Sequence, residues 1–381
     1  MTHPHHPNRR QSLHALLGLG VAVATPGWAQ SPRASANARA LTVAQVVDMS
    51  TAQVDVSKDF VVGSRTAWQE INAKGGVQGS PVKHLVIEVD GSVAGLRTAL
   101  ESLKSEPHVV AVFGTAGDRT ATLFATALRR ELPDMPHVAP WLHNVDAVAS
   151  TNTFPIFASR QEQIAHAIKS LSVMGITQVG TVYGSAAEFA VYRRDLEHIA
   201  RSLKLAVTPY YTEGDLRDLA QTLTPESPRV LLFVGGTPEL VRFAQGVEKQ
   251  AAQRYLIAMS DVNLQSIQQL GASRFTPMIA TQVVPMVNSS LPLVKGYRVA
   301  LGRLFDEPPT PLSLAGYVSA RYTFEVLHGI DGPVTRQTAL QAFGRRSTID
   351  LGGFRIAPDA RYQGTAFVTQ SMVAADGRLV G

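Results

Sequence analysis

The sequence has 381 residues, of which 45% are hydrophobic and 17% are charged. This length exceeds that of most single domains, so we expect two globular lobes. The formal net charge of +5 is spread along the chain without a block of Lys and Arg, which argues against nucleic acid as a partner. No cysteine is present, which excludes disulfides, thiol catalysis, thiolate metal sites and a lipid anchor on an N-terminal cysteine.

Residues 1–29 have the pattern of a secretory signal peptide. Arg9 and Arg10 precede an apolar stretch, and small residues lead up to a cleavage point after Ala29. The paired arginines resemble a twin-arginine signal, and an ordinary Sec signal is the alternative. We therefore predict an exported, periplasmic protein that is not a lipoprotein, with a flexible leader at residues 30–39.

From residue 41 onward, short apolar runs alternate with helical patterns, which predicts an α/β fold with mainly parallel sheets. One apolar helical stripe runs from Phe60 to Ile71, and Gly75 follows it where a C-terminal cap is expected. A second stripe runs from Phe189 to Leu203. We predict strands at residues 41–47, 82–89, 109–113, 137–139, 179–183, 205–210, 230–234, 256–259 and 278–284.

Two segments interrupt this alternation and suggest domain boundaries. Residues 150–163 and 283–292 carry turn residues and prolines. After the second boundary the pattern is helical for about fifty residues. The tail then returns to strands, with Asp376-Gly377 as a predicted hairpin turn.

Motifs that mark enzymes and cofactor sites are missing. The chain has no G-x-G-x-x-G after its first strand, no P-loop, no G-x-S-x-G and no H-E-x-x-H. Carboxylates such as Asp90, Asp118 and Asp261 form an acid/base pair only if the fold brings them together. We therefore expect no catalytic residue, no cofactor and no metal ligand, and an exported enzyme is the least favoured function.

The stretch GTAGDRTATLF, residues 114–124, follows a buried strand and opens a helix. Backbone N–H groups and the positive end of the helix dipole meet at such a point and suit a carboxylate or another small anion. The alternative is an ordinary strand-to-helix turn with Asp118 as the N-cap residue. Taken alone, these residues favour the ordinary turn.

The stretch INAKGGVQG, residues 71–79, resembles the N-terminal block of type I periplasmic binding proteins of the Leu/Ile/Val-binding family. These are the soluble receptors of ABC importers for branched-chain amino acids, amides, urea and some aromatic acids. Further blocks match the family in order along the mature chain: VVAVFGTAGDRTA, MPHVAPWLHN, VGTVYGSAAEFAVY, VLLFVGGTPELVRFAQ, PLSLAGYVSARYTFEVL and LGGFRIAP.

The resemblance implies two doubly wound α/β lobes joined by three hinge crossovers, a Venus-flytrap arrangement. Residues 40–157 and 285–348 would form lobe 1, and residues 158–284 and 349–381 would form lobe 2. The cleft would capture an amino acid, an amide, or an aromatic or carboxylic acid and deliver it to an ABC permease in the inner membrane. The alternative is a ligand-sensing receptor for a signalling partner.

The resemblance also implies ligand contacts at Thr115, Ala116, Gly117, Ala139, Trp141, His143, Phe189 and Asp261. Where amino-acid-binding members carry small and hydroxyl residues, this chain has Trp141 and His143. Trp141 would narrow the pocket or stack on an aromatic ring, and His143 would donate to an anion; the alternative is a packed tryptophan and a surface histidine. Asp261 is the best candidate for pairing with an α-ammonium group, and without a sure partner of this kind a carboxylic acid is an alternative ligand.

Overall fold

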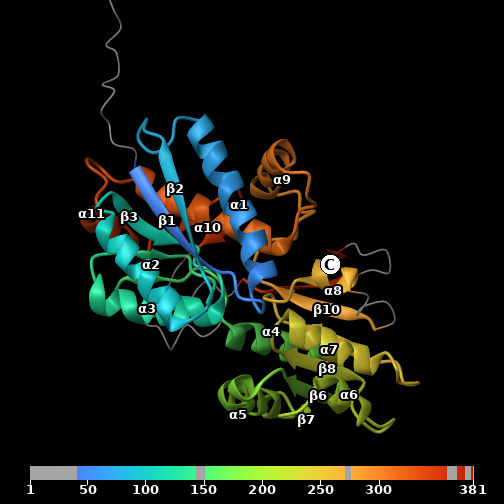
Figure 1. The fold of residues 1–381 in the computed structure, drawn as a ribbon. Coiled ribbons are helices and arrows are strands. Elements are labelled where there is room, and N and C mark those ends of the chain that lie inside the picture. The colour runs from blue at the N-terminus through green and yellow to red at the C-terminus, as the bar shows by residue number, and fades with distance from the viewer. Residues whose placement is uncertain (1–40, 143–150, 271–275, 358–366, 374–378, 381) are drawn as a thin grey trace, which may run out of the picture. The chain divides into compact units, whose positions relative to one another are not determined.

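A computed structural model describes residues 41–142, 151–270, 276–357, 367–373 and 379–380. The predicted signal peptide, the leader, His143 and the Asp376-Gly377 turn lie outside these residues. Within them, strands and helices alternate along the chain, which confirms the predicted α/β class (Figure 1). Among the described residues, no helix combines the length and apolar character needed to cross a membrane.

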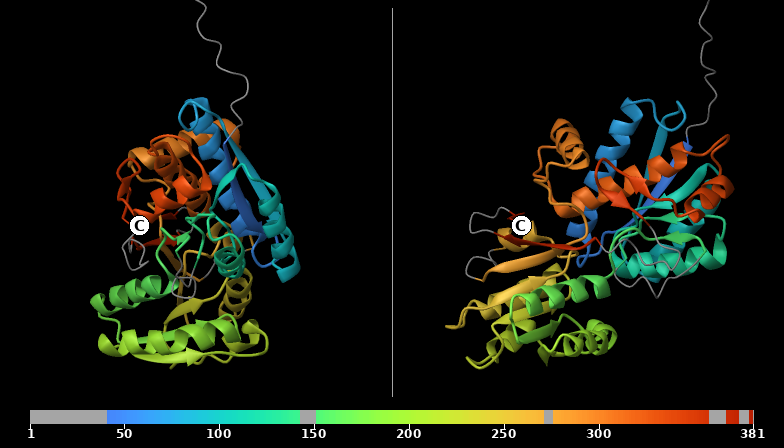
Figure 2. Two further views of the ribbon diagram at one scale, coloured as in Figure 1. Left: turned by 90° about the vertical axis from the view of Figure 1, so that its left-hand side faces the viewer. Right: turned by 180° about the vertical axis from the view of Figure 1, so that it is seen from behind.

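The first sheet is entirely parallel and has the order β2-β1-β3-β4-β5. Its central strands are buried, as expected for a parallel sheet covered on both faces. Helices α2 and α3 pack on one face of this sheet and form one hydrophobic core with it. Helices α1, α9, α10 and α11 pack on the other face and form a second core (Figures 1 and 2). The strands are β1 (Leu41–Asp48), β2 (Val82–Val89), β3 (Val109–Phe113), β4 (His137–Val138) and β5 (Thr153–Phe154). The helices are α1 (Val54–Ala73), α2 (Val93–Ser105), α3 (Asp118–Glu131), α9 (Pro292–Leu304), α10 (Pro311–His328) and α11 (Arg336–Gly344).

The second sheet has the order β14-β13-β10-β9-β8-β6-β7. Its five strands from β6 to β10 are parallel, whereas β13 runs antiparallel to β10. Helices α4 and α5 cover one face, and α6, α7 and α8 cover the other. The strands are β6 (Gln178–Tyr183), β7 (Ala206–Tyr210), β8 (Val230–Val234), β9 (Tyr255–Ala258), β10 (Met278–Gln282), β13 (Thr369–Val373) and β14 (Leu379–Val380). The helices are α4 (Arg160–Val173), α5 (Ala186–Ser202), α6 (Leu216–Gln221), α7 (Thr237–Val247) and α8 (Leu264–Gln269).

The chain passes between the two sheets near both interruptions in the sequence pattern. Residues 155–159, within the first interruption, lead from β5 into α4, and residues 283–291, within the second, lead from β10 into α9. The three helices α9 to α11 confirm the predicted helical stretch. A small separate hairpin of β11 (Ile349–Asp350) and β12 (Arg355–Ile356) follows, and its Ile356 packs in the core of the first sheet.

The α1 helix follows its sequence pattern closely. Phe60, Trp68 and Ile71 are buried on one face of it, as the spacing predicts. The helix ends at Ala73, Lys74 is its C-cap residue, and Gly75 follows with a φ of 105°, a conformation that glycine adopts at little cost because it has no side chain. The N–H of Gly75 donates to Asn72 O, so the predicted role of this glycine as a cap is confirmed.

One prediction at a helix start is wrong. The N-cap of α3 is Gly117 rather than Asp118, which is the first residue of the helix. Gly117 has a φ of 99°, and a Cβ atom there would lie 2.6 Å from Asp48 Cβ, so both backbone and space exclude aspartate from this position. Asp118 instead places its carboxylate in the first turn, where the helix dipole favours a negative charge.

Candidate functional site

The predicted residues of the first sheet lie together at the carboxyl ends of β1, β3 and β4. The N–H of Ala116 donates to Val46 O at 3.1 Å, and the N–H of Trp141 donates to Thr115 O at 2.8 Å. These bonds join the loop after β3 to the end of β1 and to the loop after β4. Five predicted residues, Thr115, Ala116, Gly117, Ala139 and Trp141, therefore share one edge of the sheet.

The Trp141 side chain is part of the hydrophobic core. Only 3% of the residue is exposed, and its ring meets Phe60 and Phe157 edge-on at centroid distances of 5.6 and 5.1 Å. Aromatic rings in this arrangement stabilise each other beyond the area that they bury. Trp141 was predicted either to contact the ligand or to pack inside the protein, and its described contacts are those of a packed tryptophan.

A buried histidine supports the same edge. His137 Nε2 lies 2.9 Å from Thr115 Oγ1, and the histidine is fully buried. Burial lowers the pKa of His137 to about 3, because the charged form loses its hydration. A neutral His137 therefore fixes the Thr115 hydroxyl in the loop that opens α3.

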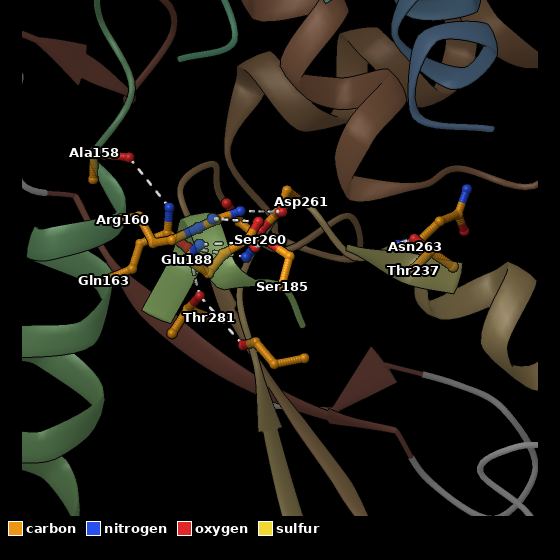
Figure 3. Close-up of polar contacts among 11 residues, drawn as sticks. Ala158, Arg160, Gln163, Ser185, Glu188, Thr237, Ser260, Asp261, Asn263 and Thr281 are labelled. Atoms are coloured by element: carbon orange, nitrogen blue, oxygen red, sulfur yellow. Dashed lines mark hydrogen bonds and ion pairs between the residues drawn. The ribbon is translucent and has the colours of Figure 1, made fainter. Parts of the chain in front are cut away.

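In the second sheet, Asp261 follows β9 and forms a buried ion pair with Arg160. Arg160 Nη2 donates to Asp261 Oδ2 at 2.6 Å, and the two side chains are only 4% and 7% exposed (Figure 3). Burial acts to lower the pKa of Arg160, but the charge of Asp261 and smaller effects of its neighbours outweigh burial and raise it. The acid predicted to meet an ammonium group is thus held by a guanidinium.

Further groups surround the Arg160 guanidinium. It lies over the ring of Tyr192, 5.2 Å from the centroid, and 3.8 Å from Glu188 Oε1. Ser185 is the N-cap of α5, and its hydroxyl donates to Glu188. Burial raises the pKa of Glu188, while Arg160 acts to lower it. The cluster of Arg160, Ser185, Glu188 and Asp261 thus gathers at the carboxyl ends of β6 and β9.

Gln163 fixes the backbone beside this cluster. Its amide donates to Ala158 O at 3.3 Å, and its Oε1 accepts from Ser260 N–H at 2.9 Å and from Thr281 Oγ1 at 2.7 Å (Figure 3). One side chain of α4 therefore ties the ends of β9 and β10 to the crossover that enters α4. This arrangement makes Gln163 a positioning residue for the loop that carries Asp261.

Phe189, the last predicted site residue, lies in an aromatic group on α5. Its ring stacks on Tyr211 with a centroid distance of 4.8 Å and meets Tyr183 edge-on at 5.2 Å. Arg193 lies over the ring at 5.1 Å. Phe189 therefore packs against two tyrosines and an arginine of the second sheet and its helices.

Arg160 and Gln163 were not predicted from the sequence. A signal for Arg160 was available, because a cation in the first turn of a helix opposes the helix dipole and calls for a carboxylate elsewhere in the fold. Within the described part of the chain, no group of three His, Asp or Glu side chains is arranged to hold a metal ion. The polar side chains described at the two groups of strand ends are Thr115 in the first sheet and Arg160, Ser185, Glu188 and Asp261 in the second.

Two α/β sheets with a chain that passes from the first to the second and back define a type I periplasmic binding protein. The chain belongs to the periplasmic binding protein family, whose family model matches residues 40–377. This confirms the resemblance inferred from the motifs. Membership supports a solute-binding role and a periplasmic location.

Solved structures show the same fold. An extracellular ligand-binding receptor from Verminephrobacter eiseniae is 16% identical, with a TM-score of 0.80, and the alignment covers 90% of this chain and 100% of that one. A substrate-binding periplasmic protein from Ralstonia solanacearum is 19% identical, with a TM-score of 0.77 and coverage of 89% and 99%. A branched-chain amino acid transporter substrate-binding protein from Streptococcus pneumoniae, in complex with isoleucine, is 13% identical, with a TM-score of 0.76 and coverage of 90% and 98%. No protein of curated function matches the sequence.

Proposed function

We propose that this protein is the substrate-binding component of an ABC importer, which captures a small amino-acid-like or carboxylate ligand between its lobes and delivers it to a membrane permease. The observation that carries the proposal is that each sheet has a group of polar residues at the carboxyl ends of its strands, around Thr115 in the first sheet and around Arg160 and Asp261 in the second. In open α/β sheets, ligands bind beyond the carboxyl ends of the strands. Similar structures include a complex with isoleucine and a fatty acid ABC transporter protein, which supports a small organic ligand.

The proposed ligand contacts are the predicted residues together with Arg160. The N-terminus of α3, beside Thr115, Ala116 and Gly117, would receive a carboxylate, because the first N–H groups of a helix have no partner within the helix and the helix dipole favours an anion there. From the second sheet, Arg160 and Asp261 would contribute a charged pair. A ligand that touches both sheets stabilises the closed form, which is the form that a permease would recognise.

The prediction placed residues 40–157 and 285–348 in lobe 1 and residues 158–284 and 349–381 in lobe 2. Because residues up to Ile356 pack with the core of the first sheet, the proposed lobes keep the other boundaries and place the last crossover after β12. Export by the predicted signal peptide, through either the twin-arginine or the Sec route, is part of the same proposal.

A thermal-shift screen of the mature chain, residues 30–381, tests the proposed function. The panel contains amino acids, amides, and aromatic and aliphatic carboxylic acids. A ligand at a hundred times its dissociation constant stabilises a protein by about 2.7 kcal/mol, so a true ligand gives a clear rise in melting temperature. If no member of the panel raises the melting temperature of a folded sample, the proposed ligand classes are wrong.

A further inference from the structure

A cavity lies between the first half of α1, helix α8 and the segment that leads into α10, beside Val47 and Met49 at the end of β1. Its volume is about 460 Å³, which is within the range of small-molecule sites. Its described lining includes neither the predicted contact residues nor Arg160. We propose that this cavity is a separate binding site for an organic amine, whose ammonium group pairs with Asp59 and whose apolar body extends toward Leu264.

Asp59 is the centre of the proposed site. Its Oδ2 accepts hydrogen bonds from Thr310 Oγ1 at 2.8 Å and from Asn263 Nδ2 at 3.3 Å. These two neutral donors hold the carboxylate in place without neutralising its charge. An ammonium group would supply the missing positive charge and a charge-assisted hydrogen bond, which is stronger than a bond from a neutral donor.

The charges around the cavity favour a cation. The lining has more acids than bases: Asp55, Asp59, Glu88 and Glu307 against Lys58 and Arg65. Burial raises the pKa of Asp59 to about 6, because burial and the charges of Glu307 and Asp55 together outweigh the hydrogen bonds from Thr310 and Asn263, which act to lower it. A carboxylate in this condition gains from a bound cation, because the cation favours its charged form.

Two buried hydroxyls support a ligand independently of the charges. Ser57 lines the cavity and is fully buried, and its Oγ has no hydrogen-bond partner among the described residues. Ser260 lines an adjoining cavity, is 6% exposed, and its Oγ is likewise without a described partner. Buried hydroxyls are normally bonded, so unpaired ones beside a cavity indicate a bound molecule or water.

The adjoining cavity explains why the ligand should carry an apolar body. Its volume is about 380 Å³, and it shares Asn263, Gln265, Pro308 and Thr310 with the acidic cavity. Its lining contains no charged side chain, and its apolar members are Val262, Leu264, Val287, Leu312 and three prolines. An amine bound at Asp59 can therefore place a hydrocarbon group of several carbons against these residues.

Isothermal titration of the mature chain at pH 7.5 tests this site with 2-phenylethylamine as the probe and 2-phenylethanol as its uncharged analogue. We expect the amine to bind at least tenfold more tightly than the alcohol. Asp59→Asn keeps the shape and both hydrogen bonds, and it should weaken amine binding at least tenfold. Asp134→Asn, at an exposed acid outside the cavity, is the matched control and should leave the affinity unchanged.

Several results would overturn the inference: no heat with the amine at millimolar concentration, equal affinity for amine and alcohol, or an unchanged affinity in Asp59→Asn. Loss of amine binding in Asp261→Asn, with Asp59→Asn unaffected, would place the amine at the strand ends and also overturn it. Thermal melting of each variant shows that it is folded before titration. The proposed function is tested by a separate thermal-shift screen of amino acids, amides and carboxylic acids, so this inference and the proposed function can fail separately.

Discussion

Replacing Asp59 by asparagine in the unliganded protein isolates the free-energy cost of a poorly compensated carboxylate. Thr310 and Asn263 are the side-chain donors that reach Asp59, and both are neutral. Asparagine preserves an oxygen for these donors and removes the charge. The perturbation therefore changes the electrostatics of the cavity while the packing of α1 stays the same.

The magnitude follows from the pKa of Asp59, which rises from 3.8 to about 6 on folding. The native state holds this proton more tightly than the unfolded state, so the contribution of Asp59 to stability is greatest below pH 4 and is lost as the pH rises through 6. The full shift corresponds to roughly 3 kcal/mol for a fully buried group, and about 1–2 kcal/mol remains after solvent screening of a half-buried one. Asp59→Asn does not titrate and should escape this loss.

Urea unfolding of both proteins at pH 4 and pH 7, followed by tryptophan fluorescence, measures the effect. The stability of Asp59→Asn relative to the parent should increase by about 1–2 kcal/mol between pH 4 and pH 7. Effects of the substitution that do not depend on pH cancel in this comparison. A stability difference that is equal at both pH values, or that falls with rising pH, would refute the reasoning.

Three further predictions concern buried side chains. Trp141→Ala should lower the free energy of unfolding by about 3–5 kcal/mol in urea titrations, because it leaves a void beside Phe60 and Phe157; a near-neutral effect would contradict the packed position. Arg160→Met should cost about 3–5 kcal/mol, because it leaves Asp261 buried without its guanidinium, and a double variant that also carries Asp261→Asn should recover part of the loss. The contribution of His137 to stability should fall as the pH drops from 6.5 toward 3, because the unfolded state protonates His137 while the native state keeps it neutral; the parent should lose stability relative to His137→Gln over this range, and a difference that does not change with pH would be evidence against it.

The elements of the fold could be predicted because their signals are local. The apolar stripe of α1, the buried run of β3 and the glycine after α1 each lie within one short segment. Those signals depend on helical spacing, strand composition and backbone conformation, and at these elements the folded structure agrees with them. The resemblance to the family added a prediction of the order in which the chain passes between the two sheets.

The electrostatics of the sites could not be predicted because their partners are distant in sequence. Arg160 meets Asp261 across 101 residues, and Asp59 meets Asn263 across 204. Trp141 shows a different limit, since a tryptophan in a loop after a strand suits a ligand pocket and a core equally well. Its place beside Phe60 is decided by the packing of α1 against the sheet, which no short stretch of sequence records.

Small-angle X-ray scattering of the mature chain, with and without a ligand identified by the thermal-shift screen, tests the central claim most directly. Capture of a solute between the lobes predicts a smaller radius of gyration at saturation, with a midpoint that matches the binding curve. A ligand that binds and leaves the radius of gyration unchanged at every concentration would contradict capture between the lobes.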